Sequence, residues 1–159
     1  MSEHPLATRS REMFHAVWDD GDFQPFIDSL ADDVAWTNDI GAGPMRALRG
    51  KAEVVAMQLW WFDFFAGDFR HELIDVCASD QRVIQVLREV GAKDGHTFDN
   101  LALYIFEVDP DKPDRYTVVQ TLDRDRDNIA GFWSHYPDTI ATELTTLLRP
   151  FMPNPAVSA

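Results

Sequence analysis

Four polar side chains lie within apolar runs of this sequence, where their chemistry would be shielded from water: Asn38, Glu89, Tyr104 and Gln120. Glu89, in "VLREV", would serve as a general base if burial raised its pKa. Tyr104, in "LALYIFE", has a phenolic proton suited to stabilising an oxyanion. The amides of Asn38 and Gln120 would orient a substrate or a water molecule. Together the four side chains predict proton-transfer chemistry that needs no cofactor.

Three of these side chains have an equally simple structural interpretation. Glu89 would pair with Arg88 or Arg82 on a solvated strand. Tyr104 would donate to a main-chain carbonyl within a core, and Asn38 would form the turn that ends its strand. The interpretations differ in where the side chains point, and that depends on strand register.

Gln120 falls in an alternating row with Tyr116, Val118 and Leu122, which predicts an amide among inward-facing apolar neighbours. A buried amide needs a hydrogen-bond partner. We expect Gln120 to face a pocket and to bind a ligand carbonyl or hydroxyl. The alternative is a hydrogen bond to a neighbouring strand or helix.

Metal ions and other cofactors are not expected. Neither His15 nor His71 has a second histidine at the spacing of metal ligands, and Cys77 is the only cysteine. Cys77 lies in a strand-like run, where we expect an inert buried thiol. His71 with Glu72 or Asp75 would form a further acid/base pair at the edge of a pocket.

Aromatic residues make up 12% of the chain and include five tryptophans. Rings of this kind more often fill a core, but their excess favours a hollow shaped for a bulky apolar ligand. The residues expected to line that hollow are Phe14, Trp18, Trp36, Trp61, Phe65, Leu87, Asn100, Phe106 and Leu122.

The chain carries a formal net charge of −13 and has no cluster of lysine or arginine. Such a charge repels phosphate backbones and anionic lipids, so neither nucleic acid nor membrane is an expected partner. The N-terminal "MSEHPLATRSREMF" lacks the pattern of a secretory signal, and no apolar run approaches the roughly 18 residues of a membrane span. We therefore expect a cytoplasmic protein.

The catalytic candidates must be positioned by helices followed by a run of strands. Hydrophobic periodicity predicts an N-terminal helix, a short second helix, a first strand, a central helix, four strands joined by short turns, and closing helical segments. The predicted ranges are 6–18, 23–31, 32–39, 51–67, 69–79, 82–93, 97–109, 115–123 and 124–149. Residues 1–150 form one domain in this prediction, the loop 40–50 shapes the rim of a cleft, and the Pro-rich tail 151–159 is mobile.

Helices followed by an antiparallel meander indicate an α+β fold. We expect a curved antiparallel sheet with the N-terminal helices on its concave face and a cone-shaped pocket between them. The strand 97–109 is apolar on both faces, so its outer face should be covered as well. A second copy of the chain is the expected partner there, which predicts a homodimer.

Several motifs together resemble a known superfamily. "DDGDFQPFIDSLADDVAW" resembles its helix, Gly-Asp, helix and strand entry, "LRGKAEV" the start of its central helix, and "FDNLALYIFEVD" with "VVQTLD" its last two strands. In this order they resemble the nuclear transport factor 2-like superfamily, the cone-shaped, cystatin-like fold of ketosteroid isomerase, limonene epoxide hydrolase and SnoaL-like polyketide cyclases, over roughly residues 8–136. The resemblance implies a pocket and usually a dimer, but no fixed chemistry.

Compared with ketosteroid isomerase, the resemblance places Phe14 at the oxyanion tyrosine, Asn38 at the base aspartate, and Tyr104 on or near the protonated aspartic acid. Phe14 cannot donate a hydrogen bond, and Asn38 cannot take a proton at neutral pH. Steroid isomerisation by that set of residues is therefore not expected.

Compared with limonene epoxide hydrolase, "WTN" resembles the Tyr-x-Asn of the first strand, with Trp36 at the tyrosine and Asn38 at the water-orienting asparagine. The Arg-x-Asp of that family falls near "LREV", where Glu89 is the closest carboxylate. Its second aspartate, also the acid/base of SnoaL-like cyclases, falls on Gln120, and Asp123 matches a later non-catalytic aspartate. The complete catalytic set is not present.

Two functions that need a pocket remain open, beside a third class, a domain that mediates protein association and would show an apolar outer surface without an enclosed cavity. One is a SnoaL-like, cofactor-independent isomerase, cyclase or epoxide hydrolase acting on a bulky, apolar, oxygenated substrate such as a polyketide, terpenoid or steroid-like compound. The other is a non-catalytic ligand-binding or scaffold protein of the same fold. An enzyme should hold an abnormally titrating carboxyl or histidine in its pocket, whereas a binding protein should have only neutral amides and aromatic rings there.

Overall fold

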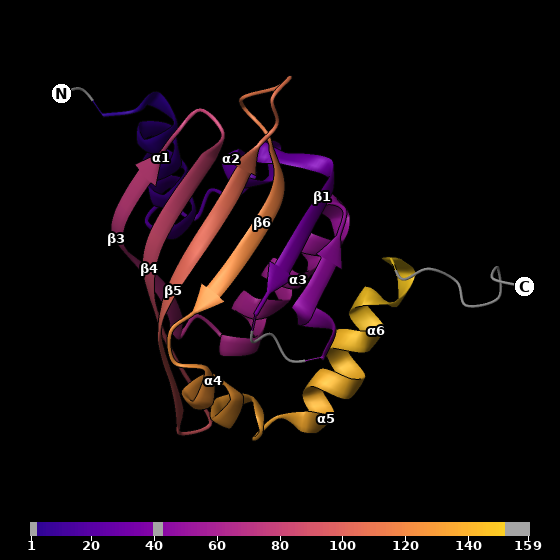
Figure 1. Ribbon diagram of the computed structural model, residues 1–159. Helices are drawn as coiled ribbons and strands as arrows, with labels where there is room; N and C mark the ends of the chain where they lie inside the picture. The colour runs from indigo at the N-terminus through magenta and orange to yellow at the C-terminus, as the bar shows by residue number, and fades with distance from the viewer. Residues whose placement is uncertain (1–2, 40–42, 152–159) are drawn as a thin grey trace, which may run out of the picture.

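A computed structural model gives the fold of the chain and describes residues 3–39 and 43–151. Its centre is a curved sheet of six strands in the order β2-β1-β6-β5-β4-β3 (Figure 1). The strands are β1 Leu30–Asn38, β2 Ala47–Arg49, β3 Phe69–Ala78, β4 Arg82–Lys93, β5 His96–Val108 and β6 Tyr116–Asp123. Strands β3 to β6 pair antiparallel in chain order, which confirms the predicted meander. Strand β1 adds to β6 in parallel, and β2 forms within the predicted loop 40–50.

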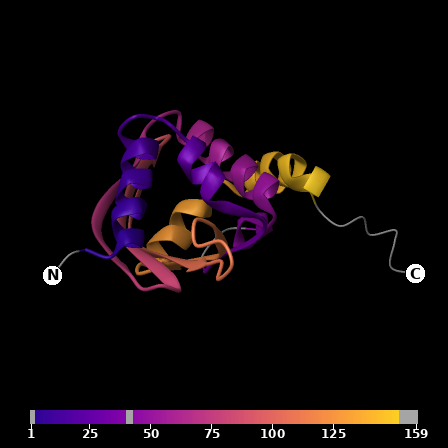
Figure 2. The ribbon, with the colours of Figure 1, turned by 90° about the horizontal axis from the view of Figure 1, so that it is seen from above.

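The helices follow the prediction in order and place. They are α1 Pro5–Trp18, α2 Gln24–Ser29, α3 Lys51–Phe65, α4 Arg126–Trp133, α5 Pro137–Thr139 and α6 Thr145–Leu148, with a π-helical turn at Ile140–Leu144 and 3-10 turns at Gly43–Arg46 and Arg149–Phe151. Seen from above, the sheet bends around the side on which α1, α2 and α3 lie (Figure 2). Helix α1 contacts β3 and β4, α3 contacts β1, β2 and β4, and α4 lies against β5. The expected α+β fold with N-terminal helices on the concave face is confirmed.

The start of α1 and both ends of α3 have residues that explain the limits of these helices. Helix α1 has Pro5 in its first turn, and the His4 ring accepts a hydrogen bond from the Leu6 amide at 3.3 Å. Helix α3 follows Gly50 and is capped by Ala66 directly after Phe65, and both capping residues have a positive φ. These caps fix the two helices that form one wall of the cavity.

A bulge decides which side chains of β6 face inward. Val108 pairs with Tyr116 and Glu107 with Val118, so Thr117 is the extra residue that reverses the alternation of the strand. The expectation that Gln120 and Leu122 face the pocket is therefore wrong: both are exposed on the outer face of the sheet. The inward row beyond the bulge is Val119, Thr121 and Asp123.

The aromatic core lies between α3, α4 and the start of β3. Phe65, which we expected to line the pocket, is instead buried in this core, where its ring stacks on Phe69 and Phe132 at centroid distances of 4.8 and 5.6 Å. The expectation of a buried thiol at Cys77 is also wrong, because this residue points outward from β3 and is exposed.

Two predictions concern segments that lie partly or wholly outside the described residues. The rim loop 40–50 is described only from residue 43, and residues 152–159 of the Pro-rich tail are not described. Among the helices in the described part of the chain, none is long and apolar enough to cross a membrane.

Candidate functional site

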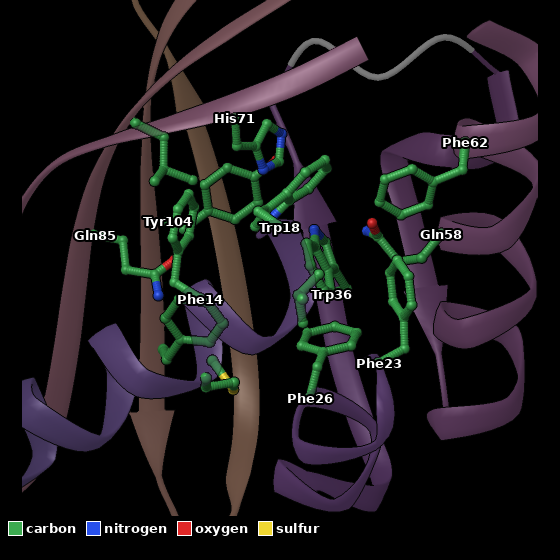
Figure 3. A pocket seen from close by; sticks show the side chains of 14 residues that line it. Phe14, Trp18, Phe23, Phe26, Trp36, Gln58, Phe62, His71, Gln85 and Tyr104 are labelled. Atoms are coloured by element: carbon green, nitrogen blue, oxygen red, sulfur yellow. The ribbon is translucent and has the colours of Figure 1, made fainter. Parts of the chain in front are cut away.

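The sheet and the N-terminal helices enclose a cavity with two adjoining chambers. The apolar chamber spans about 500 Å³ including its mouth and is lined mostly by aromatic rings (Figure 3). The polar chamber spans about 450 Å³ including its opening. Four side chains line both chambers and mark the junction between them: Trp36, Gln58, His71 and Tyr104.

Most of the residues expected to line a hollow do line this cavity. Phe14, Trp18, Trp36, Leu87 and Phe106 line the apolar chamber, and Trp61 lines the polar chamber. Three further rings of the apolar chamber, Phe23, Phe26 and Phe62, were not among the residues expected to line it. Phe26 lies on α2, Phe23 directly precedes α2, and Phe62 lies on α3. Only the packing of these helices onto the sheet shows that the three rings line the chamber.

Strand register brings three polar side chains side by side on the inner face of the sheet. His71 on β3 pairs with Glu89 on β4, and Glu89 pairs with Asn100 on β5. Residues that pair across antiparallel strands point to the same face with their Cβ atoms close together. The three side chains therefore form one row, although they are far apart in the sequence.

Glu89 is the centre of this row and is only 4% exposed. His71 Nε2 lies 3.0 Å from Glu89 Oε1, and the Tyr104 hydroxyl donates to the same oxygen at 2.6 Å. The Asn100 amide donates to Glu89 Oε2 at 2.9 Å. Burial would raise the pKa of Glu89, but the interactions with His71, Tyr104 and Asn100 outweigh it, so the pKa lies below its ordinary value. Glu89 is therefore an anion at neutral pH.

Asp123, at the end of β6, is the second carboxyl of the polar chamber. The Asn100 amide nitrogen that donates to Glu89 also donates to Asp123 Oδ1, at 2.5 Å. Burial raises the pKa of Asp123 to about 7, and the negative charge of Glu89 adds to the effect. Its other oxygen, Oδ2, is buried without a hydrogen-bond partner among the described residues. At neutral pH this carboxyl can therefore either hold or release a proton.

His71 is held between aromatic rings and the carboxylate. The Trp18 ring lies against the imidazole with a centroid distance of 4.1 Å, and Phe69 approaches its edge at 5.0 Å. Because His71 borders both chambers, it can meet a ligand that extends from one into the other.

The structure places the four candidate catalytic residues in different settings. Glu89 lies within the site, and Asn38 is half-buried and lines the polar chamber. Tyr104 also lines it, but its hydroxyl proton is directed to Glu89, which leaves no second proton for an oxyanion. Burial and the charge of Glu89 raise the pKa of Tyr104 well above its ordinary value, so the phenol stays neutral. Gln120 is outside the site.

The partner of His71 and the place of Asp123 in the wall of the polar chamber were not predicted. We expected His71 to pair with Glu72 or Asp75, which are its neighbours in the sequence, whereas its partner is Glu89 across the strand pair. Asn100, which we expected to line the hollow, is instead buried. Its amide donates to both Glu89 and Asp123 and so links the two carboxyl groups. Within residues 3–39 and 43–151, no group of three or more His, Cys, Asp or Glu side chains could hold a metal ion.

Comparison with known proteins gives a family and a fold. A model for a SnoaL-like domain matches residues 11–116, more than half of the chain. The chain is similar to Bal32a from a soil-derived mobile gene cassette, at 21% identity and a TM-score of 0.68, covering 80% of this chain and 98% of that one. It is also similar to a protein of unknown function with a cystatin-like fold from Xanthomonas campestris, at 20% identity and a TM-score of 0.69, covering 79% and 95%. No curated protein matches the chain.

Proposed function

Because the chain belongs to the SnoaL-like domain family of the nuclear transport factor 2-like superfamily, we propose that it is a cofactor-independent enzyme that moves protons within a bulky, apolar, oxygenated molecule. The observation that carries this proposal is the pair of carboxyls in the polar chamber. Glu89 is held as an anion, while Asp123 has a pKa of about 7. Environments that drive two neighbouring carboxyls apart in pKa are typical of acid/base catalysis.

The shape of the cavity supports the class of substrate. The aromatic chamber would take an apolar body, and the polar chamber would take the end that carries oxygen. A net charge of −13 does not favour an anionic substrate. Polyketide, terpenoid and steroid-like ketones meet both conditions.

The roles follow from the positions of His71 and Asp123 and from the raised pKa of Asp123. In a ketone whose carbon–carbon double bond begins one carbon beyond the position next to the carbonyl, His71, at the junction, takes a proton from the carbon between the two groups, and Asp123 gives its proton to the carbonyl oxygen, which forms a dienol. The dienol then returns its oxygen-bound proton to Asp123 while His71 delivers its proton to the far carbon of the former double bond. A double bond has moved, and both side chains are back in their starting states.

Glu89 supports His71 in this scheme and is not itself the base. Three donors already surround it and its pKa is lowered, so it has little tendency to take a proton. Its charge stabilises the imidazolium that forms on His71. Asn38, which lines the same chamber, would orient the substrate oxygen or a water molecule.

Proton transfer can be tested before the natural substrate is known. We expect at least one of a panel of bicyclic ketones, monoterpenoid enones and steroid enones to exchange hydrogen for deuterium next to its carbonyl in D₂O, faster with the protein than without it. His71→Gln should lower this rate by about 10²–10⁴-fold. The matched control is His15→Gln, an exposed histidine on α1 that pairs with Asp19. NMR of the recovered ketones measures the exchange.

A ligand-binding protein without catalysis is the second candidate function. It is favoured by the hydrogen bond that Tyr104 donates to Glu89, because a polar group whose partner lies within the protein also stabilises a cavity wall. Ketones that bind but show no exchange above the rate in buffer would contradict the enzyme and support this alternative.

The outer face of the sheet supports a homodimer. Leu103 and Leu122 pair across β5 and β6 and are 37% and 42% exposed. Exposed leucines side by side in the middle of a sheet are typical of an interface. We expect light scattering to give twice the 18.1 kDa mass of one chain, and Leu103→Lys to give a single chain at micromolar concentration. Leu59→Lys, at an exposed position of α3, is the control. A wild-type monomer would contradict the dimer.

A further inference from the structure

Gln58 is a polar side chain on a helix that is otherwise mostly apolar where it meets the cavity. It lies on α3 in the run "VVAMQLWWF" and borders both chambers. Figure 3 shows its amide pointing away from α3 into the cavity, toward Trp36. No side-chain hydrogen bond of Gln58 occurs within the described residues. An amide in this setting has a donor and an acceptor available to a ligand.

Gln85 shows what a structural amide in the same cavity looks like. It also lines the apolar chamber, but its amide nitrogen donates to the Ser10 hydroxyl at 2.8 Å and so joins β4 to α1. Gln58 makes no such bond between elements. The packing of α3 therefore does not explain why an amide is placed at this position.

We propose that Gln58 recognises a second oxygen function of the substrate, at the junction between the chambers. The proposal rests on the proposed function, because it assumes that the first oxygen lies in the polar chamber beside Asp123. The substrate class is thereby narrowed to an apolar ring system with two oxygen functions, one at its reacting end and one part-way along its body. An amide can donate to a carbonyl or exchange hydrogen bonds with a hydroxyl.

The side chains opposite Gln58 support a recognition role. His71 and Tyr104 form the other side of the junction, and both are directed toward Glu89. In the proposed function His71 acts on the reacting carbon, and the Tyr104 proton is directed to Glu89, so a second oxygen at the junction would find its hydrogen-bond partner on α3. Gln58 is half-buried, and a site that offers a polar group to a ligand discriminates against a ligand that lacks the matching atom.

Two compounds that differ by one hydroxyl test this inference: 1-tetralone and 4-hydroxy-1-tetralone. We expect wild-type protein to bind 4-hydroxy-1-tetralone about 10-fold more tightly, the effect of one good hydrogen bond. In Gln58→Leu the ratio of the two dissociation constants should fall to about one. Gln120→Leu makes the same change at an exposed amide and should keep the wild-type ratio. Tryptophan fluorescence measures binding of both compounds to each protein.

The side-chain amide resonances give a second, direct readout. The Gln58 signal, identified as the one missing from Gln58→Leu, should shift more with 4-hydroxy-1-tetralone than with 1-tetralone. A Gln58→Leu protein that keeps the wild-type preference would overturn the proposal about Gln58 and leave the proposed function intact. Failure of both compounds to bind wild-type protein would instead contradict the ligand class, and with it both proposals.

Discussion

Replacement of Asp123 by asparagine is expected to lower turnover by about 10²–10⁴-fold, the usual contribution of a positioned general acid or base. Asparagine can keep the oxygen that accepts from Asn100, but it has no proton to give at neutral pH. In the wild-type protein burial, and then the charge of Glu89, raises the pKa of Asp123 to about 7. The rate should therefore fall as the pH rises through this value, because the proton used in the reaction is lost. A pH–rate profile on a ketone that exchanges deuterium measures this.

The same variant is expected to be more stable than the wild type above neutral pH. The pKa of Asp123 is about 4 in the unfolded chain and about 7 in the folded chain. At a pH between these two values the folded state binds more protons than the unfolded state, so the free energy of unfolding falls as the pH rises. Partial screening by water reduces the full effect to about 2 kcal/mol. Asp123→Asn should therefore gain about 2 kcal/mol relative to wild type at pH 8 and little at pH 4, measured by urea unfolding.

Asp111→Asn is the matched control, since Asp111 is an exposed carboxyl in the loop between β5 and β6. It should change neither the rate nor the dependence of stability on pH. Wild-type turnover in Asp123→Asn, with an unchanged pH profile, would contradict the role of Asp123. A loss of activity together with a gain in stability would separate a catalytic role from a structural one, because removing a structural contact lowers both.

The order of helices and strands was predictable because each element carries its own periodic signal. The alternation of Val83, Gln85, Leu87 and Glu89 along β4 puts these residues on one face, and the structure buries that face. Phe14 and Trp18 lie one turn apart on α1, and both line the apolar chamber. Local patterns of this kind need no knowledge of neighbouring strands.

The composition of the polar chamber was not predictable, because it depends on contacts between strands. The extra residue Thr117 in β6 turns Asp123 inward and Gln120 outward, and a bulge leaves no reliable trace in an alternating run. The pairing of His71 with Glu89 depends on the register of β3 against β4. Gln58 did leave a signal, as a lone amide within an apolar stretch of helix. That signal alone could have indicated a cavity-facing position.

Replacement of Glu89 by glutamine is expected to destabilise the protein by about 3 kcal/mol, within the range seen when one member of a buried charged cluster is removed. The carboxylate receives donors from Tyr104 and Asn100 and contacts His71. A glutamine side chain has the same shape as the glutamate but only one oxygen atom that can accept. Its amide group would face one of the donors that the carboxylate now accepts from. At least one buried donor is then left without an acceptor, which carries most of the energetic penalty.

The dependence of this effect on pH has the opposite sign to that at Asp123. The folded-state pKa of Glu89 is lowered, so the carboxylate stabilises the wild type above its unfolded pKa, and this stability is lost as the pH falls through the folded pKa. The difference in free energy of unfolding between wild type and Glu89→Gln should therefore be largest at neutral pH and smaller in acid. Urea unfolding from pH 3 to pH 8 measures it.

Glu107→Gln provides the control, because it makes the same change on the neighbouring strand at an exposed ion pair with Arg82, 2.9 Å away. Its effect should stay below about 1 kcal/mol.

The decisive readout of Glu89→Gln is the titration of the second carboxyl. The negative charge of Glu89 helps to raise the pKa of Asp123. Without that charge the Asp123 titration, followed by NMR, should move to lower pH, and the upper limb of the pH–rate profile should move with it. A merely structural role for Glu89 would lower stability and leave the Asp123 titration where it is. An unmoved titration would therefore show that the two carboxyls are not coupled and would contradict the division of roles between them.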